Sequence, residues 1–438
     1  MKITEFFNTD YVDYASYDNL RKIASVMDGQ KNTSRKILYT VLEKNIKTEV
    51  KVSQLSAKMA EFAEYLHGDA SGVIVTMAQD YAGTNNLPLL TTGGNFGNRM
   101  SPDASAPRYI YTAGTKHTWD IFNKDDNAIL NNQIFEGEKI EPMFYIPSLP
   151  LILINGAEGV SSGFSQKILP RNPKDIEDYV KSSLKGKNKP FRAKPYFNGF
   201  KGVVEQGDNS NQWKIKGLVQ RIKVNKVQID EVPVGVSLKA FIKTLDKLED
   251  NGKIRSYVDY SDPKKKIFKF EVTMDSKVLK LLSDEALLKY LGLVKTVSEL
   301  YNVMSEDNKI LSLTSVDDIM QYYLSVKLKF MTKRKAYLQT KIGEDIRLLV
   351  SKYLFIKAVT EDTLIISKRK KADIVKDLEG FDKIIKSEGN YDYLLNMSIA
   401  SLTEERMAKL MSDIKEKKSE LDFVRSSTLE EMWLKDLD

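Results

Sequence analysis

Two long helical patterns in the last third of the chain set the strongest limit on its fold. Between residues 315 and 345, apolar side chains recur at four- and three-residue steps: Ile319, Tyr323, Val326, Phe330 and Tyr337. Residues 402–425 repeat this pattern with Met407, Leu410, Ile414, Leu421 and Val424, and Lys417 interrupts it. Such spacing is typical of helices that pair along a seam. We expect a long antiparallel coiled coil whose helices are joined by a compact segment at 350–400, although an ordinary helical bundle would give the same pattern.

Shorter elements are expected before these helices. Apolar periodicity predicts helices over residues 18–27, 33–45, 53–66 and 71–82. The last two are separated by His67-Gly68-Asp69, which is the outline of a helix-turn-helix. The apolar run within 144–165 predicts a buried strand followed by a glycine turn at 156–160. Short strand-like runs mix with helical ones from 196 to 313, so the predicted class is α+β and mostly helical.

Composition narrows the classes of site and partner. The 438 residues suffice for two to four domains, and no apolar run is long enough to span a membrane. Cysteine is absent, which excludes disulfides and thiolate metal sites and suits a cytoplasmic location. With two histidines, a multi-histidine metal site within one chain is excluded. The net charge of +7 favours anionic partners.

A loop from Gly93 to Thr112 carries the strongest chemical signal. It is rich in Gly, Asn, Ser and Pro, and near its end Arg108 directly precedes Tyr109. A tyrosine beside a fixed cation can attack a phosphodiester, and the same cation can hold the phosphate under attack. Taken alone, the pair is a weak signal, because Arg-Tyr pairs are common and a loop tyrosine is more often a packing residue.

This loop resembles the active-site tyrosine segment of the type IIA DNA topoisomerases, in the style of the eukaryotic and T-even bacteriophage enzymes. Other blocks resemble the same family in the same order: MDGQKNTSRKILY (27–39), YLHGD (65–69), MAQDYAGTNN (77–86), FYIPSLPLILINGAEGVSSGFS (144–165), PYFNGFKG (195–202), YDYLLNMSIASLTEER (391–406) and EEMWLKDLD (430–438). The resemblance spans nearly the whole chain and covers the breakage–reunion half of the enzyme. It implies that the chain cuts duplex DNA through a transient phosphotyrosine link so that another duplex can pass.

The resemblance implies a role for each candidate residue. Tyr109 is the nucleophile, Arg108 steadies the phosphate and His67 assists near the scissile phosphate. Lys31, Arg35 and Lys36 cluster at a helix N-terminus, where they can hold phosphates; a solvated basic face is the alternative. Arg99 is a further expected DNA contact. Val160 is expected to be an apolar wedge that bends the duplex, and the alternative is a plain core residue.

The resemblance also implies a domain plan. Residues 1–170 form a winged-helix-type DNA-gate domain with the catalytic tyrosine, residues 171–313 form a tower domain, and residues 314–438 form the coiled coil and a terminal dimer gate. Two copies are expected to pair about a two-fold axis on double-stranded DNA.

Cofactors and further partners follow from what the sequence lacks. It contains no glycine-rich nucleotide site and no acidic metal cluster. Mg²⁺ and ATP are therefore expected on a large subunit that carries the ATPase and metal-binding folds. The chain stops at Asp438 without a DNA-wrapping domain, so relaxation of supercoils is expected. The location is then cytoplasmic, or the host-cell cytoplasm if the chain is phage-encoded. Two other classes stay open, a non-catalytic winged-helix DNA-binding protein and a tyrosine recombinase, although a recombinase tyrosine would lie near the C-terminus.

Overall fold

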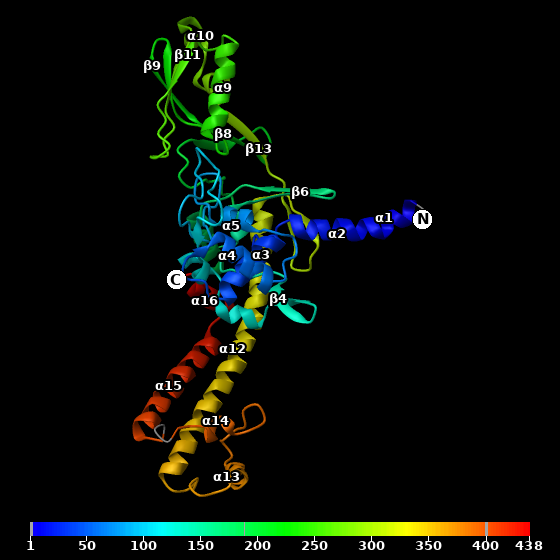
Figure 1. The fold of residues 1–438 in the computed structure, drawn as a ribbon, viewed down its shortest axis with the longest axis vertical. Helices are drawn as coiled ribbons and strands as arrows, with labels where there is room; N and C mark the ends of the chain where they lie inside the picture. The colour runs from blue at the N-terminus through cyan, green and yellow to red at the C-terminus, as the bar shows by residue number, and fades with distance from the viewer. Residues whose placement is uncertain (1–2, 188, 399–401) are drawn as a thin grey trace. The chain divides into compact units, whose positions relative to one another are not determined.

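The structure is a computed structural model that describes residues 3–187, 189–398 and 402–438 (Figure 1). These residues form two compact units. One contains residues up to 126, residues 130–327 and the chain end from 436, and the other contains residues 127–129 and 328–435. Helical residues make up 44% of the structure, and the strands pair in antiparallel sheets. The α+β class is confirmed as a mixed fold, but helices do not form the majority that the sequence predicted.

The first unit begins with helices that carry the basic cluster and the tyrosine loop. Its first elements are α1 (Ile3–Asn8), α2 (Asp10–Lys22), α3 (Asn32–Glu43), β1 (Val50–Lys51), α4 (Val52–Phe62), α5 (Ser71–Ala78) and β2 (Tyr111–Thr112). Helices α3, α4 and α5 pack on one another. Helix α2 ends before Ile23 rather than at residue 27, because the backbone of Ser25 and Val26 pairs with Met304 instead.

The apolar run after residue 144 contains a helix where the sequence predicted a strand. Helix α7 (Leu151–Asn155) is buried on every side, and a continuous apolar run does not distinguish a buried helix from a buried strand. Gly156, with φ of 72°, ends the helix. The predicted turn is then strand β5 (Ala157–Ser161), which forms a hairpin with β6 (Phe164–Ile168). Before this run lie α6 (Lys116–Ile121), the 3-10 helix η1 (Lys124–Ala128), β3 (Asn132–Phe135) and β4 (Glu138–Pro142).

Two sheets dominate the segment that the sequence assigned to a tower. One has the order β11-β12-β10-β9 and the other β13-β8-β7. A core that includes Phe241, Phe270 and Val272 joins the first sheet to the helices beside it (green in Figure 1). The elements are α8 (Pro173–Leu184), β7 (Val203–Gln206), β8 (Gln212–Lys216), β9 (Leu218–Lys223), β10 (Lys226–Glu231), α9 (Leu238–Asp250), β11 (Ser256–Asp259), β12 (Phe270–Thr273), α10 (Ser276–Leu281), α11 (Asp284–Tyr290), β13 (Val294–Ser298), β14 (Asn302–Met304) and β15 (Ile310–Ser312). The domain boundaries predicted after residues 170 and 313 stay predictions.

Two long helices of the second unit run antiparallel. Lys335, on α12, donates to the carbonyls of Arg425 and Ser427 at the end of α15. Further along α12, the charge of Asp345 acts on Lys417, which lies nearer the start of α15. The elements of this part are α12 (Val316–Thr360), α13 (Lys371–Leu378), α14 (Asp392–Leu395), α15 (Glu404–Ser426) and α16 (Leu429–Asp436). The two predicted helices are thus present, and residues 399–401 of the block at 391–406 lie outside the described residues.

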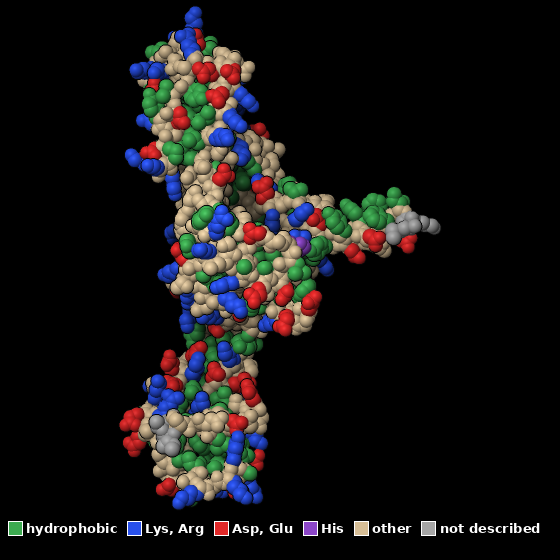
Figure 2. Space-filling view, in the orientation of Figure 1, with side chains coloured by type: hydrophobic (Ala, Val, Ile, Leu, Met, Phe, Trp, Pro, Cys, Tyr) green, Lys and Arg blue, Asp and Glu red, His purple; other side chains and the backbone are tan. Residues whose placement is uncertain are grey.

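The first two helices expose an unusual amount of apolar surface. Figure 2 shows hydrophobic side chains along them, among which Ile3 is 75% and Tyr14 59% exposed. Their acidic residues include Asp10 and Asp13. In the part of the chain that the structure describes, no helix has the length and apolar character needed to cross a membrane.

Candidate active site

Tyr109 lies in an exposed turn directly before a short strand. Its side chain is 65% exposed, whereas Ile110 is buried. The backbone N–H of Tyr109 donates to the carbonyl of Ala106 at 2.9 Å. The chain then enters β2, where Tyr111 exchanges backbone hydrogen bonds of 2.8 Å with Gly93. The backbone is therefore held on both sides of the tyrosine while its phenol is free to meet a large substrate.

Arg108 lies beside the phenol in the free chain. Its Cζ is 5.0 Å from the ring centroid of Tyr109, a cation–π arrangement. At exposed sites such contacts contribute about 0.5–1 kcal/mol, which is weak enough for an incoming phosphate to displace. A guanidinium binds phosphate oxygens in a planar, bidentate manner. The observed pair therefore fits the chemistry that the sequence predicted for it.

His67 is exposed and lies after helix α4, apart from this pair. Its Nε2 is 3.3 Å from the hydroxyl of Tyr17, and its ring meets the ring of Tyr65 edge-on with centroids 5.6 Å apart. Among the described residues, the structure gives His67 no contact with Arg108 or Tyr109. Its predicted role near the scissile phosphate remains a prediction.

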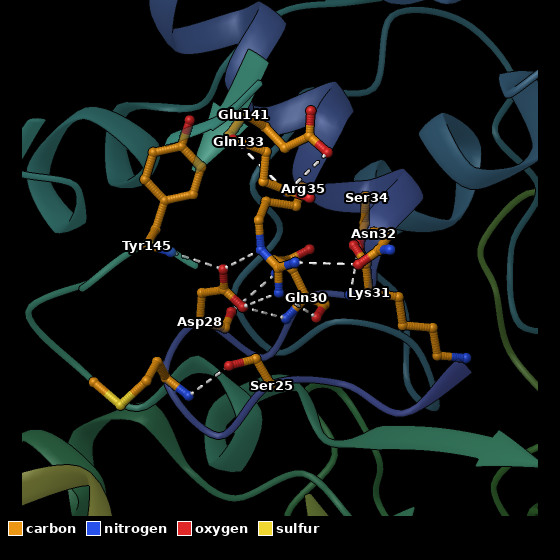
Figure 3. Close-up of polar contacts among 11 residues, drawn as sticks. Ser25, Asp28, Gln30, Lys31, Asn32, Ser34, Arg35, Gln133, Glu141 and Tyr145 are labelled. Carbon is orange, nitrogen blue, oxygen red and sulfur yellow. Dashed lines mark hydrogen bonds and ion pairs between the residues drawn. The ribbon is translucent and has the colours of Figure 1, made fainter. Parts of the chain in front are cut away.

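Arg35 lies in a buried network rather than on a phosphate-binding face (Figure 3). Its Nε donates to Asp28 Oδ2 at 2.8 Å and its Nη2 to Asp28 Oδ1 at 3.1 Å. Nη2 also donates to the carbonyl of Gln30 at 3.0 Å. Asp28 in turn accepts from the backbone N–H of Tyr145 at 2.9 Å. These contacts give Arg35 a structural role in place of the DNA contact that the sequence predicted.

The two lysines of the same cluster differ from each other. Lys36 forms an ion pair with Glu141 at 2.8 Å and donates to the carbonyl of Ala63, so its ammonium is also satisfied inside the protein. Lys31 points away from the Asp28 network in Figure 3. It lines a cavity of about 360 Å³ next to α5. Burial lowers the pKa of Lys31, and the charge of Glu158 opposes that effect. Of the three cations, Lys31 is therefore the one that stays a candidate phosphate contact.

Val160 lies on the β5–β6 hairpin and is 73% exposed, which excludes the alternative of a plain core residue. The hairpin is fixed against α2: Ser161 Oγ donates to Asn19 Oδ1 at 2.5 Å, and the backbone N–H of Ser162 donates to Asp18 Oδ2 at 2.9 Å. A Cβ at Gly159 would lie 2.1 Å from the carbonyl oxygen of Lys22, so only glycine fits there. An apolar tip on a fixed hairpin has the geometry that a wedge requires.

Arg99 is largely enclosed, in contrast to the expected DNA contact. Its Nη1 pairs with Glu231 Oε1 at 2.6 Å, and its side chain is 10% exposed. The guanidinium lies between two rings, with Cζ 5.2 Å from the centroid of Phe200 and 5.1 Å from that of Phe268. This residue of the tyrosine loop therefore packs on the tower segment.

Carboxylates near the tyrosine loop do not assemble into a metal site. Within the described residues, no group of three or more His, Asp or Glu side chains comes together. Asp69 accepts hydrogen bonds from Ser71 and Ser56, which lower the pKa of its carboxyl. The residues present thus do not fit a Mg²⁺ ion, and we derive no step through one in this chain.

One buried network of hydrogen bonds and an ion pair was not predicted from the sequence. Arg171 and Glu299 are fully buried and joined by two bonds, of 2.5 and 2.7 Å. Glu299 also accepts from Trp213 at 2.8 Å, from Tyr301 at 3.0 Å and from the backbone N–H of Leu169 at 2.7 Å. Its members come from three separate stretches, at 169–171, 213 and 299–301, so a single sequence offers no signal that they meet.

Comparison with known proteins decides the family. The sequence signature of the DNA gyrase/topoisomerase IV family, specifically of its A-type subunits, matches residues 21–438. The chain belongs to this family. The resemblance of the tyrosine loop to type IIA topoisomerases is thereby confirmed.

Two of the similar proteins are DNA topoisomerases 2 of eukaryotes. DNA topoisomerase 2 of Plasmodium falciparum (isolate K1 / Thailand) is 34% identical over 474 residues, which cover 99% of this chain and 34% of the relative. DNA topoisomerase 2 of Penicillium chrysogenum is 33% identical over 476 residues, with coverages of 99% and 30%. The chain thus spans about a third of the length of these relatives. The narrower likeness to T-even bacteriophage enzymes stays a prediction.

A solved structure agrees with this placement. The crystal structure of the Plasmodium falciparum topoisomerase II DNA-binding, cleavage and re-ligation domain superposes with a TM-score of 0.91 at 33% identity. The superposition covers 99% of this chain and 63% of the chain in that crystal structure. The two chains therefore share their fold over nearly all of the present sequence.

Proposed function

We propose that this chain is the breakage–reunion part of a type II DNA topoisomerase, with Tyr109 as its nucleophile. The observation that carries this proposal is an exposed phenol beside the Arg108 guanidinium, on a backbone anchored at both ends. Family membership supports the proposal, as does the solved relative, whose description names DNA binding, cleavage and re-ligation.

The proposed reaction exchanges one phosphoester for another. The phenol oxygen of Tyr109 attacks phosphorus, a sugar oxygen leaves, and the phenol proton passes to a base. Arg108 holds the non-bridging phosphate oxygens, and His67 accepts or bridges the proton. The phosphotyrosine link conserves the bond, so the sugar oxygen can return and reseal the strand without ATP.

The DNA surface in this proposal follows from the exposed candidates. Lys31 contacts a phosphate at the N-terminal end of α3. Val160 enters between base pairs and bends the duplex. Bending presents the scissile phosphate to the tyrosine, because the loop itself is held in place.

The assembly is proposed to contain two copies of the chain about a two-fold axis, together with a large subunit of the kind found with the T-even bacteriophage enzymes. That subunit would carry the sites for ATP and Mg²⁺, and the complex would relax supercoiled DNA. The support is that the curated relatives extend well beyond the matched region. When bound, a divalent ion would neutralise charge on the transferring phosphate.

Trapping a covalent protein–DNA adduct tests the proposal. Tyr109→Phe should bind duplex DNA normally and form no adduct, because the attacking oxygen is gone. Tyr111→Phe, two residues on and also exposed, is the matched control and should retain the adduct.

Peptide mapping of the adduct separates the alternatives. An adduct that persists in Tyr109→Phe would move the nucleophile to another tyrosine. DNA binding by the wild-type chain with no adduct, even with a partner subunit present, would favour a non-catalytic winged-helix DNA-binding protein.

A further inference from the structure

The tyrosine loop is attached to the protein at two separate places. At its ends, Gly93 and Tyr111 pair through their backbones, and the N–H of Ser53 donates to the carbonyl of Pro107 at 3.3 Å. In its middle, Met100 enters the tower core, and its carbonyl accepts from the N–H of Leu238 at 3.1 Å. The second attachment is the unexpected one, because it joins the loop to a different sheet.

Arg99 is the polar part of that second attachment. Its guanidinium bonds Glu231 and the carbonyl of Val232, both at the end of strand β10. Phe200 and Phe268 cover the guanidinium. The guanidinium thus bonds two acceptors on adjacent residues and is enclosed by two rings, an arrangement that holds the side chain in one position.

Glu231 is held as firmly as its partner. Its side chain is 4% exposed. Besides Arg99, it accepts from the backbone N–H of Lys201 at 3.1 Å and from its neighbour Val232 at 3.0 Å. The carboxylate therefore joins three chain segments at one point: the tyrosine loop, the segment around residue 200, and the end of β10.

Local hydrogen bonds hold the part of the loop between Asn95 and Ser105. Asn98 folds it into a turn, since its side chain accepts from the N–H of Met100 at 2.9 Å. The N–H of Ser105 donates to the carbonyl of Asn95 at 2.9 Å. Gly97 has φ of 77°, and a Cβ there would lie 2.2 Å from the carbonyl oxygen of Pro102, so the crossing point admits only glycine. We therefore expect a displacement at Arg99 to reach the whole of this part of the loop, which leads directly to Tyr109.

We propose that Arg99 is a positioning residue for Tyr109, and that the tower sheet sets the place of the phenol through the Glu231–Arg99 pair. The proposal rests on the proposed function of Tyr109 and deepens it. A misplacement of the nucleophile by about 1 Å can cost about 100-fold in rate. Movement of the tower would then control cleavage without any tower residue touching the scissile phosphate.

The first test measures the loop without using activity. The chain has no cysteine, so Asp103→Cys, at an exposed loop position, takes a single spin label. Arg99→Met and Glu231→Gln should both increase the mobility of this label. Arg255→Met is the control, because it removes an exposed ion pair with Asp275 elsewhere on the tower; it should leave the label unchanged. Unchanged mobility in Arg99→Met, in a protein that unfolds cooperatively, overturns the proposal.

The second test compares DNA binding with cleavage in the presence of a partner subunit. Arg99→Met should lower adduct formation by about 10- to 100-fold at unchanged DNA affinity, and Arg99→Lys should restore part of the adduct. Equal losses of affinity and adduct would return Arg99 to the role of a DNA contact and overturn the proposal. If the wild-type chain forms no adduct, the proposed function fails, whereas the label result still decides whether Arg99 holds the loop.

Discussion

At the scale of single residues, the structure divides the predicted cations by what already holds them. Internal ion pairs hold Arg35, Lys36 and Arg99. Lys31 instead lines a cavity, and Arg108 lies over the ring of Tyr109. A single sequence could pick out these basic positions but not the partners of Lys36 and Arg99, because Glu141 and Glu231 lie more than a hundred residues away along the chain. The exposure of Tyr109 agrees with its place in a glycine-rich loop, whereas an exposed Val160 followed from the family resemblance and not from the predicted glycine turn, which is strand β5.

Arg35→Met should destabilise the first unit by about 3–5 kcal/mol, because the substitution leaves Asp28 buried and uncompensated. Urea unfolding followed by circular dichroism measures the loss. Lys174→Met, which removes an exposed pair with Asp178, is the control and should change stability by less than about 1 kcal/mol. A small effect of Arg35→Met on stability combined with a large loss of DNA affinity would restore the phosphate-binding interpretation.

At the scale of elements, a helix could be predicted from the sequence when it buries one face, but not when it buries all of its faces. Helices α3 and α4 keep one polar face, so their periodicity was visible in the sequence. Helix α7 has no polar face, and it was mistaken for a strand. The β5–β6 hairpin was missed for a different reason: its position depends on contacts with α2, far away in the sequence.

Val160→Ala should reduce DNA bending and adduct formation while leaving most phosphate contacts intact. Unstacking a base step costs a few kcal/mol, and the wedge offsets that cost. Energy transfer between dyes at the two ends of a short duplex reports the bend. Ile134→Ala is the control, since Ile134 is also an exposed strand residue, 74% accessible, on a different hairpin. Unchanged bending in Val160→Ala would remove the wedge from the proposal.

At the scale of the whole molecule, the chemistry of one chain falls short of the proposed reaction. Attack by Tyr109 places negative charge on the phosphate and on the leaving oxygen, and Arg108 offsets only part of it. Asp103 and Asp69 are the acids nearest in sequence to the candidate catalytic residues, and Asp69 is already bonded to two serines. Metal ions contribute several kcal/mol at such centres.

Magnesium added to the purified chain alone should therefore give little adduct on labelled duplex. A partner with an intact acidic fold should restore the adduct, and alanine at the carboxylates of that partner should abolish it again. A denaturing gel resolves the covalent species. Strong magnesium-dependent cleavage by the chain alone would contradict the divided site and require metal ligands among its own aspartates.

The Arg171–Glu299 network limits how this protein can be recombined with its relatives. The Glu299 carboxylate accepts hydrogen bonds from Arg171, Trp213, Tyr301 and the backbone of Leu169. Segments before and after the tower sheets therefore meet at the same two oxygen atoms. A chimera that exchanges residues 172–313 would have to import a glutamate in register with Arg171. Without that glutamate, the chimera would bury the Arg171 guanidinium with no carboxylate to pair with it. Successful grafts should therefore come from donors that carry both members of the pair, whatever their identity elsewhere.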